Sequence, residues 1–526
     1  MFSRSVKLLL SAFFVVAVLL PLVAMVARID WSQIGGVVTS EQFGSALLGS
    51  LSVSAAATVI SVLIAYVLAL AVNRSRIPFK GALTVLFTLP MLIPSISHGL
   101  GLINLFGTNG LMTQALGLGG ELYGFTGVLL GSVMYSFPVA FLMLSDAMKY
   151  TDASLYEAAE VLGVPPVRRF TSITMYFMKR PLISAVFAVF TMVFTDYGVP
   201  LAVGGRFATL PVYLYTEVIG LLDFSKGAFI GLVLLIPAIV TFLIDLRRKE
   251  HEGMGFVSRR LAIKKNLGRD IGLGAFCLLV LVAVGLVLGS FAAITFMAQY
   301  PYDTSFTLDH IVNTASRGML GFFGNSLAMS ALVALFGTCI AYVTAYVTAR
   351  TTSRLLTRVL HLSSIASLAI PGIVLGLGYV ITFRSTFLYG TLFILVLVNI
   401  IHFFASPYMM AHNAMKKMNA NFEDVGKTLC VGRLRLLRDV FVPNTLNTIA
   451  EMFGYFFVNS MITISAVAFL YNTRTMPLSI MINQLEGDMM LEAAAFVSLV
   501  ILLSNIVAKI LIGLVKKFCQ VRYGKE

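Results

Sequence analysis

Long apolar segments recur along the whole chain, and short polar stretches separate them. A helix of about 20 apolar residues spans the hydrocarbon core of a bilayer, whereas a soluble core does not bury so many of them. Hydrophobic residues make up 58% of the 526 residues, and charged residues only 12%. The chain is therefore predicted to be an all-α polytopic membrane protein with about 12 transmembrane helices. We place these helices at residues 8–28, 45–73, 81–106, 124–146, 181–203, 227–246, 271–297, 326–349, 359–383, 391–412, 447–470 and 493–515.

Basic residues are concentrated in alternate loops between these segments. Of the 38 Lys and Arg residues, 31 lie on one side of the predicted topology, largely within 74–80, 149–180, 247–269 and 416–438. Loops rich in Lys and Arg remain in the cytoplasm, so this side and both termini are predicted to be cytoplasmic. The net charge of +14 then reflects membrane topology rather than nucleic-acid binding. The four cysteines lack metal-site spacing, and we predict no cofactor and no metal site.

The chain repeats its own sequence in parallel, at offsets of 276, 277 and 267 residues. The matched pairs are Ala65-Tyr66-Val67 with Ala341-Tyr342-Val343, Arg74 with Arg350, Gly99-Leu100-Gly101 with Gly376-Leu377-Gly378, and Ala147-Met148-Lys149 with Ala414-Met415-Lys416. Two parallel six-helix repeats imply a pseudo-two-fold axis along the membrane normal, with a pathway between the halves. We therefore predict two homologous domains, 1–250 and 271–526, joined by a cytoplasmic linker at 251–270.

The cytoplasmic loop at 147–181 has the pattern of a helix-turn-helix knob. Glu157, Ala158 and Ala159 belong to a run of good helix formers. Gly163 then provides a backbone that can turn, and Pro165-Pro166 breaks the helix. A second, short amphipathic segment follows. The loop is polar enough to stand in water and apolar enough to dock into a groove.

The second half carries a degenerate copy of this loop at 413–446. The copy places Asp424 where the first loop has Glu157, Gly426 where it has Ala159, and Cys430 where it has Gly163. A positive φ is free of strain only for glycine, and Gly432 follows two residues after Cys430. We therefore predict that the second turn has moved to Gly432 and that Cys430 lies on the last helical turn.

Gly426-Lys427-Thr428 looks like the end of a phosphate-binding loop. That motif needs a glycine five residues before its own glycine, where Asn421 stands, and it needs a preceding strand. A nucleotide site is not predicted here or elsewhere in the chain. Any ATP hydrolysis therefore requires a separate polypeptide.

Few polar residues fall inside the predicted spans. Asp196 is the clearest ionisable one, and glycine and proline follow it within 195–205. A membrane carboxylate lines a cavity or meets a partner. Asp196 is therefore either a pathway or gate element, together with Tyr197, or a cap that braces a broken helix. Thr463 lines a path in one interpretation and bonds to a neighbouring helix in the other.

Together these features resemble the permeases of type I ABC importers, in a fused form that carries two permease domains in one chain. The first loop resembles the EAA loop of that family, with its Glu-Ala-Ala, three residues and Gly. The chain looks most like the ferric-iron permeases and the related 2-aminoethylphosphonate permeases. The resemblance covers nearly the whole chain and rests also on 94–101, 371–378, 195–205 and 463–470.

This resemblance implies a multi-pass protein of a bacterial cytoplasmic membrane that imports ferric iron, or alternatively 2-aminoethylphosphonate or another small anion. It implies two partners, a homodimer of cytoplasmic ATP-binding subunits and an extracytoplasmic substrate-binding protein. The chain itself is then a transport subunit and not an enzyme. The residues that take the family's coupling role are Glu157, Ala158, Ala159 and Gly163 in the first loop, with Asp424, Gly426 and Gly432 in the second.

Two other classes of protein fit parts of the sequence. A secondary transporter of the major-facilitator type also has two parallel six-helix halves. It would carry charged residues in its cavity and a longer central loop, whereas this chain has large loops between the fourth and fifth spans of each half. A channel or assembly scaffold would leave the two coupling-type loops without a purpose.

Overall fold

The computed structural model describes residues 2–117, 122–149, 151, 153–247, 263, 265–351, 354–419 and 421–523. The first half comprises α1 (Phe2–Phe14), η1 (Val15–Leu19), α2 (Leu20–Ala27), α3 (Ile34–Val38), α4 (Glu41–Arg74), α5 (Lys80–Phe87), η2 (Leu89–Leu92), α6 (Ser95–Phe106), α7 (Leu111–Leu116), α8 (Phe125–Lys149), α9 (Ser154–Val161), α10 (Pro166–Arg169), η3 (Phe170–Met175), α11 (Tyr176–Phe194), α12 (Gly198–Val203), α13 (Leu210–Tyr215), η4 (Thr216–Gly220) and α14 (Phe224–Arg247). The predicted linker at 251–270 lies largely outside the described residues.

The second half is also helical, apart from one short antiparallel hairpin that the sequence did not predict. Its elements are α15 (Leu267–Thr295), β1 (Met297–Gln299), β2 (Asp303–Phe306), α16 (Asp309–Thr314), η5 (Ala315–Met319), α17 (Leu320–Ala349), α18 (Arg354–Ala366), η6 (Ser367–Ala369), α19 (Gly372–Phe383), α20 (Leu392–His402), α21 (Ala405–Lys416), α22 (Phe422–Thr428), α23 (Arg433–Leu436), η7 (Leu437–Phe441), α24 (Val442–Asn444), α25 (Leu446–Ile462), α26 (Leu478–Gly487) and α27 (Leu491–Tyr523).

Eight helices in the described part of the chain are long and apolar enough to cross a membrane, and two bent helix pairs raise this number to ten. These ten coincide with ten of the twelve predicted spans, which confirms an all-α polytopic membrane protein. The predicted span 181–203 is interrupted, because α11 ends at Phe194, and the predicted spans 81–106 and 447–470 have no counterpart among the ten. The span 81–106 is broken between α5 and α6, and in the span 447–470 helix α25 has 17 residues and ends at Ile462.

Prolines cause the breaks in the third span of each half. Pro90 lies in η2 and Pro94 directly precedes α6, while Pro371 directly precedes α19. Proline lacks the N–H that an α-helix needs and disfavours helical backbone in the residue before it. The chain accordingly bends by 109° between the segments Leu355–Ala369 and Gly372–Phe383.

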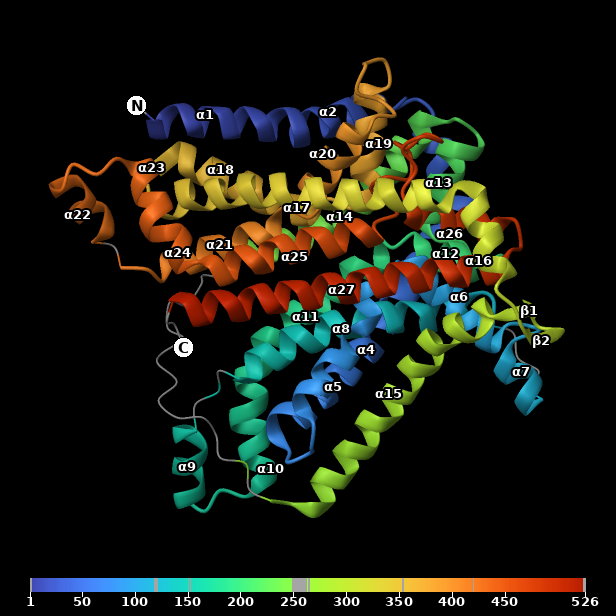
Figure 1. Cartoon of the computed structure of the whole chain (residues 1–526), viewed down its shortest axis with the longest axis horizontal. Coiled ribbons are helices and arrows are strands. Elements are labelled where there is room, and N and C mark those ends of the chain that lie inside the picture. Colours follow the sequence, from blue (N-terminus) through green and yellow to red (C-terminus); the bar gives the residue numbers. More distant parts are fainter. Residues whose placement is uncertain are drawn as a thin grey trace.

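The two predicted coupling loops lie at the same end of the molecule (Figure 1). Both chain termini lie at this end, as do α9, α10, α22 and α23. The opposite end carries α7, α13, α26 and the hairpin of β1 and β2. This arrangement is the one that parallel repeats with an even number of spans require.

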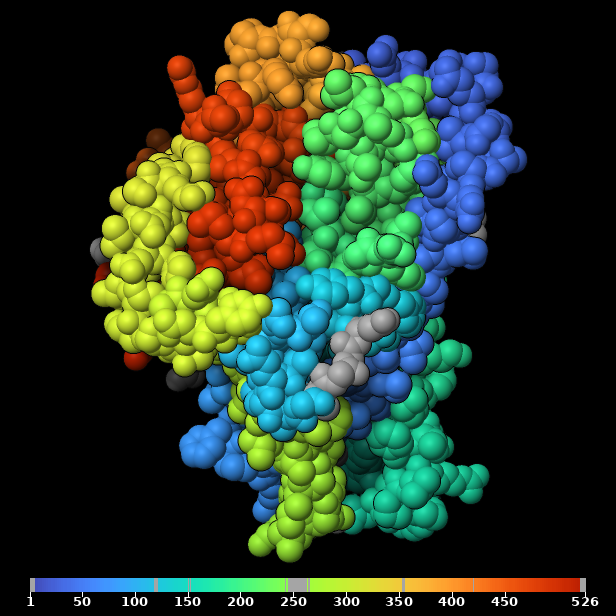
Figure 2. Space-filling view, turned by 90° about the vertical axis from the view of Figure 1, so that its right-hand side faces the viewer, coloured from blue at the N-terminus to red at the C-terminus, as the bar shows by residue number. Residues whose placement is uncertain are grey.

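The two halves meet at that opposite end. In Figure 2 the segment around α13, drawn in green, lies against the red segment that precedes α26. Tyr215 and Phe469 stack across this contact, with their ring centroids 5.8 Å apart. Tyr197 packs behind them, with its ring centroid 4.7 Å from that of Tyr215. Aromatic side chains from both halves therefore fill the interface at this end.

The first helix of each half packs against the other half. In Figure 1, α1 and α2 run beside α18 and α19 of the second half, and α2 also contacts α14 of its own half. Tyr379 Oη on α19 donates a hydrogen bond of 2.8 Å to the carbonyl oxygen of Ala17. A Cβ added to Gly378 would lie 2.9 Å from the carbonyl oxygen of Pro21. Only a glycine at this position permits the two backbones to approach so closely.

Helix α15, the first helix of the second half, likewise packs against the other half. It packs against α6, where a Cβ added to Gly101 would lie 2.6 Å from Val287 Cγ1. Gly101 and Gly378 are the equivalent glycines of the repeated Gly-Leu-Gly segments. The sequence halves predicted as domains are therefore interlocked, and each holds one helix of its partner.

Candidate functional site

The first coupling loop forms the predicted helix-turn-helix. Helix α9 ends in a turn at Gly163, whose φ is +67°. The turn is closed by two backbone hydrogen bonds, from Gly163 N to Glu160 O at 3.0 Å and from Val164 N to Ala159 O at 2.9 Å. This hydrogen-bond pattern ends many helices at a glycine. Pro166 then begins α10, where its missing N–H costs no hydrogen bond.

The second coupling loop has the same turn in the same register, so its predicted shift to Gly432 is wrong. Cys430 adopts the left-handed conformation, with a φ of 54°. Its N–H donates to Lys427 O at 3.1 Å, and Val431 N donates to Gly426 O at 2.8 Å. Gly432 has an extended backbone, with φ −64° and ψ 148°.

Packing explains why the turn stays at Cys430. Gly426 is buried, and a Cβ there would lie 3.5 Å from Leu436 Cδ2 of the following helix. A turn two residues later would rotate α22 by about 200° and carry Gly426 away from this contact. The left-handed conformation costs a non-glycine residue about 1–2 kcal/mol, which the contact and the two hydrogen bonds offset.

The two knobs bury equivalent residues and expose equivalent residues. Ala159 and Gly426 are the buried small residues of α9 and α22. Glu157, Ala158 and Gly163 are exposed, as is Asp424 of the second knob. Apolar side chains are exposed as well: Val161 and Leu162 by 88% and 79% in the first knob, and Leu429 by 67% in the second. Each knob therefore presents a mixed apolar and charged surface suited to another protein.

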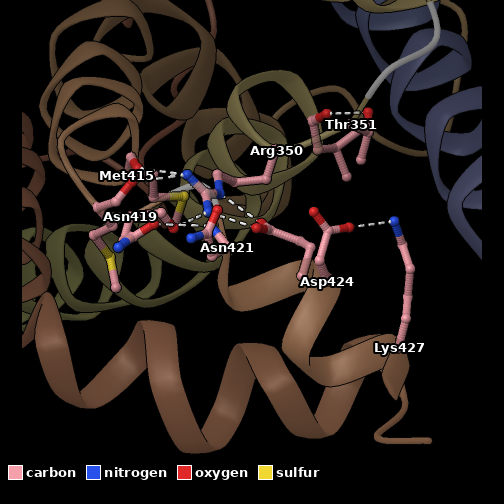
Figure 3. A network of polar contacts seen from close by, with 10 residues as sticks. Arg350, Thr351, Met415, Asn419, Asn421, Asp424 and Lys427 are labelled. Carbon is pink, nitrogen blue, oxygen red and sulfur yellow. Dashed lines mark hydrogen bonds and ion pairs between the residues drawn. The ribbon is translucent and has the colours of Figure 1, made fainter. Parts of the chain in front are cut away.

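The segment that resembles a phosphate-binding loop is part of a helix. Gly426, Lys427 and Thr428 all lie in α22, which follows a turn and not a strand. Lys427 Nζ donates a hydrogen bond of 2.8 Å to Asp424 Oδ1 of the same helix (Figure 3). This hydrogen bond and the lysine charge hold the pKa of Asp424 below its usual value.

Asp196 acts as a helix cap in the structure. Its side chain is 8% exposed and accepts hydrogen bonds from Val199 N at 3.0 Å and Gly198 N at 3.4 Å. These are the first N–H groups of α12, which have no partner within their own helix. The contacts match the prediction that Asp196 braces a broken helix, since α11 ends at Phe194 and α12 begins at Gly198.

The other two predicted pathway residues are buried between helices. Tyr197 is 1% exposed and forms part of the aromatic contact between the halves. Thr463 is 5% exposed and follows the end of α25, where its carbonyl oxygen accepts a hydrogen bond of 2.5 Å from Ser479 Oγ. Thr463 lies 267 residues after Asp196, so the two residues occupy equivalent positions of the repeat. A role in lining a pathway stays a prediction for both Tyr197 and Thr463.

The structure shows one further pair that sequence reasoning missed. Arg350 forms a salt bridge with Glu423, which directly precedes Asp424 in the second knob. Arg74 and Arg350 already match at an offset of 276 residues, but Glu423 corresponds to Tyr156 in the first loop. Comparison of the two repeats reveals only residues that both halves share. It therefore does not reveal this pair, because the first half has Tyr156 in place of Glu423.

Comparison with known families agrees with this geometry. The family model described as a binding-protein-dependent transport system inner membrane component matches twice, at residues 61–246 and 337–518. The chain therefore belongs to this family and carries two copies of its domain. Two copies of this domain in one chain define a fused permease of the type I ABC class, and the major-facilitator alternative is wrong.

Three relatives illustrate the range of the family. The ferric transport system permease protein FbpB of Actinobacillus pleuropneumoniae is 22% identical over 462 residues, which are 82% of this chain and 66% of that protein. A putative ferric transport system permease protein of Haemophilus influenzae is 23% identical over 477 residues, 84% of this chain and 73% of the relative. The molybdenum transport system permease protein ModB of Mycobacterium tuberculosis is 28% identical over 235 residues, 44% of this chain and 88% of the relative.

Proposed function

We propose that this chain is the membrane-spanning subunit of a binding-protein-dependent importer that moves ferric iron into the cytoplasm with ATP hydrolysed by a separate subunit. The observation that carries this proposal is the pair of knobs. They share one turn geometry, lie at one end of the molecule and expose apolar side chains next to acidic ones. Ferric iron is proposed because two relatives that align with more than four fifths of the chain are named for it.

The knobs suit a docking role because each connects two longer helices. Helix α9 lies between α8 and α11, and α22 lies between α21 and α25. In the proposed mechanism each knob occupies a groove of one ATP-binding subunit of a homodimer. Closure of that dimer on ATP brings the knobs together, and the attached helices move the two halves relative to each other. Glu157, Ala158, Ala159 and Gly163 contribute to the first docking surface, and Asp424 and Gly426 to the second.

The opposite end is proposed to receive the substrate-binding protein. It carries loops of both halves, which meet at Tyr215 and Phe469. A protein seated on this end contacts both halves at once and senses their separation. In this arrangement the end with the knobs and the termini faces the cytoplasm of a bacterium, in agreement with the basic loops.

Reconstitution tests the proposal. The chain is assembled in proteoliposomes with its ATP-binding subunit and its substrate-binding protein, and uptake of radiolabelled ferric iron is measured with and without ATP. We expect uptake that requires both partners and ATP, and no ATP hydrolysis by the chain alone. Uptake driven by an ion gradient without the ATP-binding subunit would refute the mechanism. Uptake of 2-aminoethylphosphonate in place of iron would refute the substrate.

A further inference from the structure

Arg350 connects the second knob to the transmembrane helix α17. It directly follows this helix, and its side chain is only 7% exposed. Its Nε and Nη2 atoms donate hydrogen bonds of 2.5 Å each to the two carboxylate oxygens of Glu423 in α22. A guanidinium that binds both oxygens of a carboxylate fixes the orientation as well as the distance of the two groups. Helix α22 is thereby held to the end of α17.

The same guanidinium also holds the chain that leads into the knob. Nη2 donates 2.7 Å to the carbonyl oxygen of Asn419, and Nη1 donates 3.0 Å to that of Met418. Its central carbon lies 5.1 Å from the centre of the Phe441 ring, on the far side of the knob. Figure 3 shows Arg350 directed towards Asn419 and the beginning of α22. One side chain therefore ties together α17, the entry to the knob, α22 and η7.

The first half has the corresponding arginine but a weaker connection. Arg74 is the last residue of α4, and its guanidinium lies 4.9 Å from the ring centre of Tyr156 in α9. Arg74 Nη2 donates a long hydrogen bond of 3.4 Å to Tyr156 Oη. Its buried Nε has no hydrogen-bond partner among the described residues. A cation–π contact is less directional than a paired carboxylate, so α4 holds α9 less firmly than α17 holds α22.

We propose that Arg350 and Glu423 are a positioning pair that makes α22 move with α17, so that force from the ATP-binding subunit enters the membrane mainly through the second half. This inference rests on the proposed function. The fold does not require an ion pair at this position, because the first half reaches the same knob geometry although its equivalent Arg74 forms no ion pair with α9 among the described residues. A buried ion pair is costly to desolvate and in itself is weak evidence for stability. Its directional hold on the knob is the property that the first half lacks.

Hydrogen exchange on the purified full chain tests the hold on α22 without any partner. The double variant Arg350→Gln with Glu423→Gln removes both charges and leaves no unpaired charge buried. We expect amides of residues 421–431 to exchange about tenfold faster, which is the effect of losing one charge-assisted hydrogen bond. Amides of residues 154–164 should be unchanged. Asp146→Asn, which removes an exposed ion pair with Lys149, is the matched control and should change neither peptide. Unchanged exchange at 421–431 in the double variant would overturn the proposal.

Coupling in the reconstituted complex tests the consequence. The quantity measured is radiolabelled ferric iron transported per ATP hydrolysed, normalised to assembled complex. We expect the double variant to lower this ratio at least about fivefold. Arg350→Lys keeps the charge but cannot bind both carboxylate oxygens in parallel, and it should give an intermediate ratio. Arg74→Lys should change the ratio much less.

The ratio separates positioning from mere structural support. A loss of structure lowers the amount of complex and leaves iron transported per ATP unchanged in the complex that remains. An unchanged ratio in the double variant, with the unaltered complex active, would therefore overturn the positioning role. If the unaltered complex shows no uptake that depends on ATP, the proposed function fails instead, and the exchange experiment still decides whether the pair holds α22.

Discussion

Replacing Gly378 by alanine should loosen the contact between α2 and α19. The added Cβ would lie 2.9 Å from the carbonyl oxygen of Pro21 and 3.2 Å from its carbonyl carbon, whereas ordinary contacts begin at 3.4 Å. The obstructing atoms belong to backbone, so a side-chain rotation cannot relieve the clash. Overpacking costs about 1–3 kcal/mol, and alanine returns up to about 1 kcal/mol of helix propensity. We expect a net loss of about 1–2 kcal/mol in the free energy of unfolding.

The assay is unfolding in mixed micelles titrated with dodecyl sulfate, together with hydrogen exchange of residues 5–27. Gly285→Ala is the matched control, because among the described residues no atom lies within 4 Å of a Cβ at Gly285 in α15. This control should be neutral or slightly stabilising, since alanine favours the helix. Exchange in residues 5–27 should rise only in the Gly378 variant. If both variants have the same stability and the same exchange, the close approach of α2 to α19 is refuted.

Three further predictions concern the knobs and the cap. Gly163→Val should strain the turn by about 1–3 kcal/mol and reduce co-purification of the ATP-binding subunit. Gly432→Val should retain the subunit, because the backbone at Gly432 is extended. Equal loss of the subunit in both variants would contradict this prediction. Cys430→Gly should relieve the left-handed conformation and stabilise the second knob by about 0.5–1 kcal/mol after the entropy of glycine is counted, measured as slower exchange at 421–431. Asp196→Ala should lower the stability by about 1 kcal/mol, whereas Asp196→Asn should keep normal transport per folded molecule; strongly reduced transport by the folded asparagine variant would show a pathway role instead.

The sequence predicts the topology well because lipid imposes simple rules. Apolar length and the placement of basic loops depend on the bilayer and not on tertiary contacts, so ten of twelve spans correspond to helices or bent pairs. The span at 447–470 is wrong in its second part. Apolar residues continue after Ile462, but the backbone turns there, and composition alone does not distinguish an apolar helix from an apolar turn.

The predicted turn at Gly432 failed for a related reason. Intrinsic preference favours glycine in the left-handed conformation, but the contact between Gly426 and Leu436 fixes the register of the knob. The pair of Arg350 and Glu423 was equally inaccessible, since residues 73 positions apart give no local pattern. Packing between segments decides both features, and a single sequence does not contain that information in readable form.

The packing of each half's first helix against the other half has a consequence for biosynthesis. The hydrogen bond between α19 and the first helix joins Tyr379 to Ala17, and these two residues are 362 positions apart in the chain. At usual translation rates, the ribosome needs roughly 20–70 s to make the chain between them. During that time the first helix lies in the bilayer next to α14, but its main partners, α18 and α19, do not yet exist. Release of the nascent chain after the first six spans would leave the face that packs on α18 and α19 exposed to lipid, so maturation of the N-terminal part waits for synthesis of the C-terminal part.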